Sequence, residues 1–143
     1  MDDRLKHRAL TEKIIGIFYD VYNELGHGFI ESVYEKALEF ALSQNGISVQ
    51  RQIDIAVWFR GKSVGQFSAD MLVEECVLLE LKACRALDSA HEAQLLNYLR
   101  ATEIEVGLLL NFGLRPQLKR LAFDNVRKKV PKGSLVDNLF SKE

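Results

Sequence analysis

The chain has 143 residues, of which 48% are hydrophobic and 27% charged, with a formal net charge of −1 at pH 7. This length fits one compact domain with its own core, and the composition is that of a soluble globular protein. The charge excludes a polycation, and the strongest apolar run, residues 106–110, is far shorter than the roughly 20 residues of a membrane helix. A charged N-terminus lacks the apolar core of a signal peptide, and Cys76 and Cys84 lack metal-ligand spacing. We therefore expect one cytoplasmic domain without a membrane segment.

Two helices are predicted first. Apolar residues recur at intervals of three and four over residues 10–25, and again over about 30–44. Gly26 and Gly28 break the pattern between them, because glycine adopts backbone conformations that end a helix. Glu31 falls in the first turn of the second helix, where the helix dipole favours a carboxylate, so its presence there has a structural explanation as well as a functional one.

An antiparallel meander follows. Apolar and other residues alternate over 47–59, a turn is expected at Gly61, and residues 64–73 run back. Residues 76–82 then form a third, Val- and Leu-rich strand after a polar break.

Charged residues at the end of this third strand suggest a site. Glu80 and Lys82 share one face of the strand because side chains alternate, and Asp70 lies ten positions earlier on the neighbouring strand. Buried charges must be paired or bound, and two carboxylates beside an ammonium suit a divalent-metal hydrolytic site. The alternative is a weak cross-strand ion pair.

The register of this hairpin makes a sharper prediction. A plain two-residue turn at Glu74 and Glu75 would pair Asp70 with Leu79 and point Asp70 away from Glu80. We therefore predict a three-residue turn or a β-bulge between Asp70 and Glu80.

The last part of the domain contains a crossover. Ser89 and Glu92 form a capping-box pattern ahead of a helix over about 90–102, and residues 106–111 form a buried strand. A strand–helix–strand unit predicts that this strand is parallel to the 76–82 strand. Periodicity leaves residues 118–123 open between strand and helix.

Polar residues on this third helix are further candidates. Gln94 and Tyr98 are four residues apart and face the same way, so both could reach the end of the strand that carries Lys82. A solvent-facing polar stripe is the alternative.

Basic residues gather near the C-terminus, where either a phosphate-binding patch or a solvated tail would explain them. Between Gly113 and Gly133 they are Arg115, Lys119, Arg120, Arg127, Lys128, Lys129 and Lys132.

Together these motifs resemble the PD-(D/E)xK phosphodiesterase superfamily. Asp70 followed by Glu80-Leu81-Lys82 is similar to its defining motif, and residues 94–98 are similar to the Q-x-x-x-Y motif of its recombination-type exonucleases. Residues 28–34, Gly-Phe-Ile-Glu-Ser-Val-Tyr, match the motif of the smaller GxxExxY group. The resemblance covers residues 10–123 and leaves 124–143 as a basic tail. It implies an α/β, restriction-endonuclease-like mixed sheet with two N-terminal helices, the meander and the crossover.

The resemblance also implies roles for individual residues. Asp70, Glu80 and the Leu81 carbonyl would bind Mg²⁺ or Mn²⁺, with Glu31 as a further metal or water contact. Lys82 would position the attacking water and stabilise the charge on the phosphate, and Gln94 and Tyr98 would orient Lys82 or the strand to be cut. Arg115, Lys119 and Arg120 are the candidate nucleic-acid contacts outside this site.

The implied activity is metal-dependent hydrolysis of nucleic acid, with DNA favoured over RNA and a link to recombination or repair. The competing hypotheses are a catalytically silent domain that binds nucleic acid or a partner protein, and a structural module. A domain of this size covers little nucleic acid, so a homodimer or a protein partner also fits.

Overall fold

The structure is a computed structural model, and it describes residues 6–128. Periodic apolar residues form the helices and alternating or wholly apolar runs form the strands, in the order expected from the sequence. The elements are α1 (Arg8–Leu25), α2 (Glu31–Gln44), β1 (Val49–Phe59), β2 (Lys62–Val73), β3 (Val77–Lys82), α3 (Ser89–Arg100), β4 (Val106–Phe112), β5 (Pro116–Ala122) and the 3-10 turn η1 (Asn125–Arg127).

The five strands form one mixed sheet in the order β1-β2-β3-β4-β5. Only β3 and β4 are parallel among the described strands, with Lys82 opposite Asn111, and the other neighbours are antiparallel. The α/β fold with a meander and a crossover is therefore confirmed. The segment that periodicity left open is the edge strand β5, because it completes the sheet beside β4.

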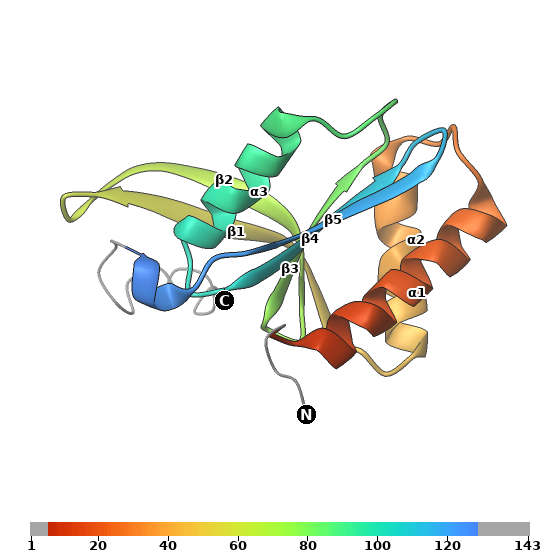
Figure 1. The fold of residues 1–143 in the computed structure, drawn as a ribbon, viewed down its shortest axis with the longest axis horizontal. Coiled ribbons are helices and arrows are strands. Elements are labelled where there is room, and N and C mark those ends of the chain that lie inside the picture. The colour runs from red at the N-terminus through yellow and green to blue at the C-terminus, as the bar shows by residue number, and fades with distance from the viewer. Residues whose placement is uncertain (1–5, 129–143) are drawn as a thin grey trace.

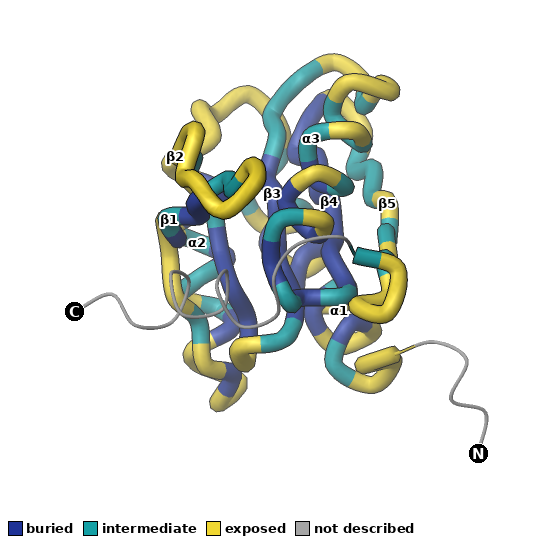
Figure 2. Tube along the Cα trace, turned by 90° about the vertical axis from the view of Figure 1, so that its left-hand side faces the viewer, coloured by how far each residue is buried: buried dark blue, intermediate teal, exposed yellow. Residues whose placement is uncertain are grey.

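The sheet separates two apolar clusters. One contains side chains of α1 and α2, among them Phe18 and Leu38, and the other contains Leu95 and Leu99 of α3. Figure 1 shows α3 on the opposite side of the sheet from α1 and α2. The central strands β3 and β4 are consequently buried on both faces, as Figure 2 shows. No helix in residues 6–128 has the length and apolar character needed to cross a membrane.

The link between α1 and α2 is held by Tyr34. Gly26 and Gly28 have φ values of 72° and 113°, which strain any residue other than glycine. The buried Tyr34 hydroxyl donates to the Gly26 carbonyl and accepts from the Phe29 N–H, while its ring stacks on Phe112 at 4.4 Å. Tyr34 thus fixes the loop that leads into α2, whose first residue is Glu31.

The β2–β3 hairpin has the predicted three-residue turn. Val73 pairs with Val77, so residues 74–76 form the turn, and both Glu74 and Glu75 adopt positive φ values. Met71 then pairs with Leu79, which brings Asp70 and Glu80 level with each other across the two strands. The register expected from the two carboxylates is confirmed.

The cap of α3 differs from the prediction by one residue. Asp88, not Ser89, is the N-cap: its side chain accepts from the His91 N–H, and His91 Nδ1 accepts from the Asp88 N–H. Both Asp and Ser are good N-caps, and a histidine ring can replace the usual Glu as the returning acceptor, which sequence spacing alone did not indicate.

Candidate active site

Asp70 and Glu80 form the centre of the site, at the point where β2 separates from β3. The ladder between these strands covers only Met71–Val73 on β2. Beyond it, carboxylates take over the hydrogen bonding: Glu80 Oε2 accepts from the Asp70 N–H at 2.9 Å, and Asp70 Oδ2 accepts from the Leu81 N–H at 2.7 Å. The two acids therefore satisfy backbone groups that a continuous ladder would have paired.

Burial and mutual repulsion disfavour the charged forms of both acids. Glu80 is 3% exposed; burial and then the nearby Asp70 carboxylate raise the pKa of Glu80 to about 8. Burial also raises the pKa of Asp70, although the Leu81 N–H counteracts part of that effect. Lys82 lowers both pKa values without reversing either shift. Lys82 therefore provides too little positive charge to keep the carboxyl groups of Asp70 and Glu80 at their ordinary pKa values.

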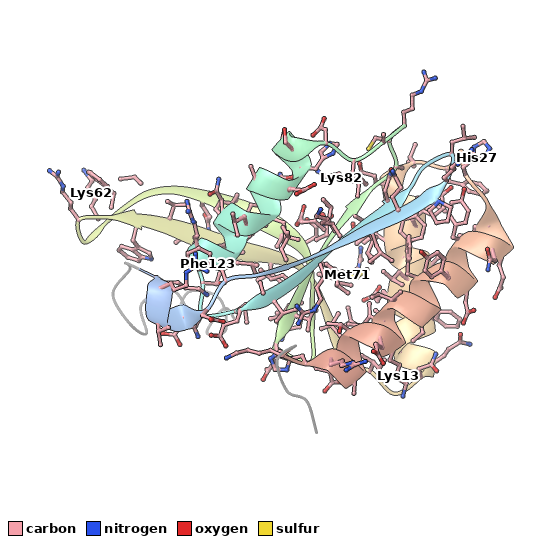
Figure 3. The ribbon with its side chains drawn as sticks, viewed as in Figure 1. Lys13, His27, Lys62, Met71, Lys82 and Phe123 are labelled. Carbon is pink, nitrogen blue, oxygen red and sulfur yellow. The ribbon has the colours of Figure 1, made fainter. Side chains whose placement is uncertain are left out.

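A chain of hydrogen bonds links Lys82 to α3. Lys82 Nζ donates to Gln94 Oε1 at 3.0 Å, and Gln94 Nε2 donates to the Tyr98 hydroxyl at 3.0 Å. Figure 3 shows Lys82 on the side of the sheet that α3 covers. Burial raises the pKa of Tyr98 to about 12, with Glu80 as the next cause, so its hydroxyl stays neutral at physiological pH. The arrangement fixes the direction of the Lys82 ammonium group.

The backbone after Lys82 is held by the end of β4. The fully buried Asn111 accepts from the Cys84 N–H through Oδ1 and donates from Nδ2 to the Cys84 carbonyl, both at 3.0 Å. Gly113 lies against the same segment: a Cβ there would come within 2.0 Å of the Cys84 carbonyl oxygen. A buried amide and a glycine therefore set the path of the chain just beyond the lysine.

At Asp70, strand β2 changes the side of the sheet to which its alternate residues point. On β2, Met71 packs in the cluster under α1 and α2, whereas Ala69 packs in the cluster under α3. Gln52, which lies on β1 between the partners of these two residues, has a φ of 55°. A left-handed residue within a strand redirects the side chains on either side of it. Asp70 thus lies at a bend, with β2 no longer paired to β3 beyond it.

Glu31 and a second glutamate approach from α2. Glu31 is exposed in the first turn, as predicted, and its charge contributes to raising the pKa values of Asp70 and Glu80. Glu35, one turn later, affects the pKa of Asp70 more strongly than Glu31 does. Its Oε2 accepts from Arg51 at 3.1 Å and from Gln52 at 2.9 Å.

The sequence prediction did not include Glu35. The signal was present, because Glu35 follows Glu31 by four residues and so lies on the same helix face. This spacing alone does not identify a site residue, since an acid on an amphipathic helix is usually solvated. Its burial depends on Arg51 and the left-handed Gln52, which only the folded chain brings to α2.

The basic residues of β5 do not join this site. Lys119 Nζ lies 3.9 Å from a Glu92 carboxylate oxygen, whereas Arg120 donates to the Lys6 carbonyl ahead of α1. Neighbouring residues on a strand point to opposite faces, so a basic run in the sequence becomes two separate groups. Arg115 is exposed in the β4–β5 turn. Lys129 and Lys132 of the basic tail lie outside the described residues.

The donor set suits a hard divalent cation. Asp70 and Glu80 supply carboxylate oxygens, and Mg²⁺ and Mn²⁺ prefer oxygen ligands. Within residues 6–128, no group of three or more His, Cys, Asp or Glu side chains forms a preassembled metal cluster. Burial and the neighbouring carboxylates raise the pKa values of both acids, and a bound cation would favour their ionised forms.

These features define an α/β domain whose acidic pair and lysine lie on the two strands of a central hairpin, beneath a crossover helix. A family model for the PD-(D/E)XK nuclease superfamily matches residues 8–121. The chain belongs to that superfamily.

Among solved structures, one similar chain is described as the crystal structure of SSO0001. The TM-score is 0.50 with 17% sequence identity, over 78% of this chain and 58% of that chain, so the likeness concerns the fold alone. The present chain thus spans little more than half of that protein's length. No curated protein matches the sequence.

Proposed function

We propose that this domain hydrolyses phosphodiester bonds of nucleic acid with the help of Mg²⁺ or Mn²⁺. The observation that carries the proposal is the convergence of Asp70, Glu80 and Lys82, with Lys82 held by Gln94 and Tyr98. The hydrogen bonds of Gln94 and Tyr98 hold the Lys82 ammonium on α3, which supports a role for this charge in the reaction.

Each residue has a distinct part in this proposal. Asp70 and Glu80, with the Leu81 carbonyl, would hold the cation, which supplies Lewis-acid stabilisation of charge on the phosphate. Lys82 places a positive charge where the attacking water meets the phosphorus and where negative charge develops. Gln94 keeps the Lys82 ammonium in position, and Tyr98 fixes the orientation of the Gln94 amide.

Glu31 and Glu35 have supporting parts. We assign Glu31 to the outer side of the site, as a water or metal contact that enters from the first turn of α2. The buried Glu35 adds negative potential behind Asp70 and strengthens the attraction for a cation.

The assignment of the chain to a subgroup of the superfamily rests on sequence motifs. We infer that residues 28–34 place the chain in the GxxExxY group, and that residues 94–98 relate it to recombination and repair exonucleases. DNA is the substrate that this relationship favours. Lys119 and Arg115 remain candidate contacts for more distant phosphates, and a second copy or a protein partner would extend the surface.

A binding protein without catalysis is the second candidate. The observation that favours it is the state of Glu80: with its pKa raised to about 8, this carboxyl is largely protonated at neutral pH when no cation is bound. A domain that never bound a metal would keep this proton and would still present the same surface to nucleic acid.

A cleavage assay separates the two candidates. Purified full-length protein is incubated with single-stranded, duplex and branched DNA and with RNA, in Mn²⁺, Mg²⁺ or EDTA. We expect cleavage that requires the cation, and Lys82→Ala should reduce the rate by about 10²–10³, the usual effect of removing a charge contact made in the transition state.

Lys13→Ala is the matched control. Lys13 is exposed on α1, remote from Lys82 in Figure 3, and its removal changes the net charge equally. It should cleave at the wild-type rate. Melting curves verify that both variants fold. Equal rates for Lys82→Ala and wild type would remove Lys82 from the mechanism, and nucleic-acid binding without any cation-dependent cleavage would favour the binding protein.

A further inference from the structure

A cavity of about 700 Å³ lies between α3 and the β1–β2 hairpin. Its walls are Val57, Trp58 and Phe67 from the strands and Ala90, Ala93, Gln94, Asn97, Tyr98, Arg100 and Ala101 from α3 and its C-cap. The cavity exists because small alanines on the helix face large rings on the hairpin. Its size falls within the range of small-molecule ligand pockets, about 300–1,000 Å³.

The lining combines aromatic rings with a few polar groups. The rings of Phe67 and Tyr98 stack with centroids 4.1 Å apart. Trp58 Nε1 is buried, and it has no hydrogen-bond partner within residues 6–128. Because this nitrogen has no accessible surface, a ligand in the cavity would contact the ring of Trp58 and not its N–H. Gln94 and Asn97 add amide groups that can donate and accept.

The charge of the lining limits what can bind. It contains no acidic residue, and its one charged group is the Arg100 guanidinium. An anionic or neutral ligand is therefore favoured over a cation. A flat ring with polar atoms at its edge matches the aromatic walls and the Asn97 amide together.

The cavity shares two side chains with the candidate active site. Gln94 lines the cavity and also accepts from Lys82, and Tyr98 lines it and accepts from Gln94. A nucleotide whose phosphate lies at Lys82 would therefore have its base or a neighbouring base within reach of the cavity.

We propose that this cavity binds one unstacked nucleobase of the strand whose phosphate lies at Lys82. The inference rests on the proposed function, since it places the phosphate at that site. The base packs against the aromatic walls, and polar atoms on its edge bond to the exposed Asn97 amide. A paired and stacked base cannot enter, so the domain selects strands that are single, frayed or locally open.

Trp58 itself reports on the cavity, because it is the single tryptophan of the chain. Its fluorescence is measured on the full-length protein while a short single-stranded oligodeoxynucleotide is added, in EDTA and again in Ca²⁺. The reference ligand is a strand of the same length made of abasic nucleotides, which keeps every phosphate. We expect saturable quenching by the normal strand and none by the abasic strand.

Ala93→Leu is the test variant, since it adds three carbon atoms to the helical wall that faces the rings and so obstructs stacking without adding a ring. Aromatic stacking on a base is worth enough that its loss should weaken binding of the normal strand by roughly 5- to 100-fold, to the level of the abasic strand. Phe40→Ala removes an aromatic side chain that is 66% exposed on α2, outside the cavity, and should leave quenching and affinity unchanged.

The outcomes separate this inference from the proposed function. Base-dependent quenching together with Mn²⁺-dependent cleavage supports both. Base-dependent quenching without cleavage supports the cavity and refutes the hydrolase. Cleavage with equal binding of normal and abasic strands, in EDTA and in Ca²⁺, overturns the cavity alone. Absence of both overturns both.

Discussion

Glu80 shows how one residue couples the site to stability. Its carboxyl titrates at about pH 8 in the folded protein, against about 4.3 in an unfolded chain. Between these values the folded state keeps a proton that the unfolded state has released. The free energy of unfolding must therefore fall as the pH rises from about 4 to about 8. The stability that the protonated Glu80 carboxyl provides is complete below about pH 4 and is lost above about pH 8.

This predicts a pH-dependent stability that depends on Glu80. In EDTA, urea unfolding of the wild type should lose roughly 2 kcal/mol between pH 6 and pH 8, from the size of this one shift. Glu80→Gln cannot ionise and should lose much less over the same interval. Asp70, Lys82, Glu31 and Tyr98 surround this carboxyl and stay in both proteins. An identical pH slope in wild type and variant would show that Glu80 ionises normally.

At the scale of elements, the end of β4 controls the segment that follows Lys82. Gly113→Ala would drive a methyl group into the Cys84 carbonyl, and backbone cannot yield as a flexible side chain can. We expect a loss of roughly 1–3 kcal/mol in unfolding free energy, typical of overpacking, and slower cleavage because the chain beyond Lys82 shifts.

Gly65→Ala is the matched control for this prediction. Gly65 lies in β2 and an added Cβ would meet nothing within 4 Å, so its substitution should change stability little. Urea unfolding of both variants at one pH is the measurement. Equal stability of the two would mean that the Cys84 segment adapts freely.

The elements also show what a sequence can predict. The hairpin turn was predictable because Asp70 and Glu80 can share a face in only one class of register. The parallel pairing of β3 and β4 followed from the length of the crossover. The bend at Gln52 was not predictable, since glutamine gives no sign of a left-handed conformation. The separation of Lys119 from Arg120 required knowing that residues 116–122 are a strand, which periodicity left open.

At the scale of the whole molecule, cation binding should stabilise the entire fold. A ligand that binds only the folded state raises its stability by mass action, by about 2.7 kcal/mol at a concentration one hundred times Kd. We expect Mn²⁺ to raise the melting temperature of the wild type relative to EDTA. Asp70→Asn and Glu80→Gln should each lose most of this increase, because both carboxylates are needed to hold the ion.

Glu31→Gln should reduce the Mn²⁺-dependent rise in melting temperature less than these two substitutions do, since Glu31 lies on a separate element and is exposed. Asp20→Asn, an exposed acid on α1, is the control and should respond as the wild type does. If Mn²⁺ stabilises Asp70→Asn and Glu80→Gln as much as the wild type, the ion binds elsewhere and the non-catalytic candidate takes precedence.

The outer part of the β1–β2 hairpin has a consequence for how such a domain can diversify. Within residues 6–128, these two strands pair only with each other beyond Ile53 and Ala69. Figure 3 shows Lys62 at the end of the hairpin remote from α1. The turn at Arg60 and Gly61 is exposed, and lengthening it cuts through no central strand. An insertion or a fused reporter at this turn would change the exposed end of the hairpin and leave Asp70 and Glu80 in place. The hairpin thus carries the acidic pair at its base and cavity walls along its length, and only its tip at residues 60–61 is left for insertions.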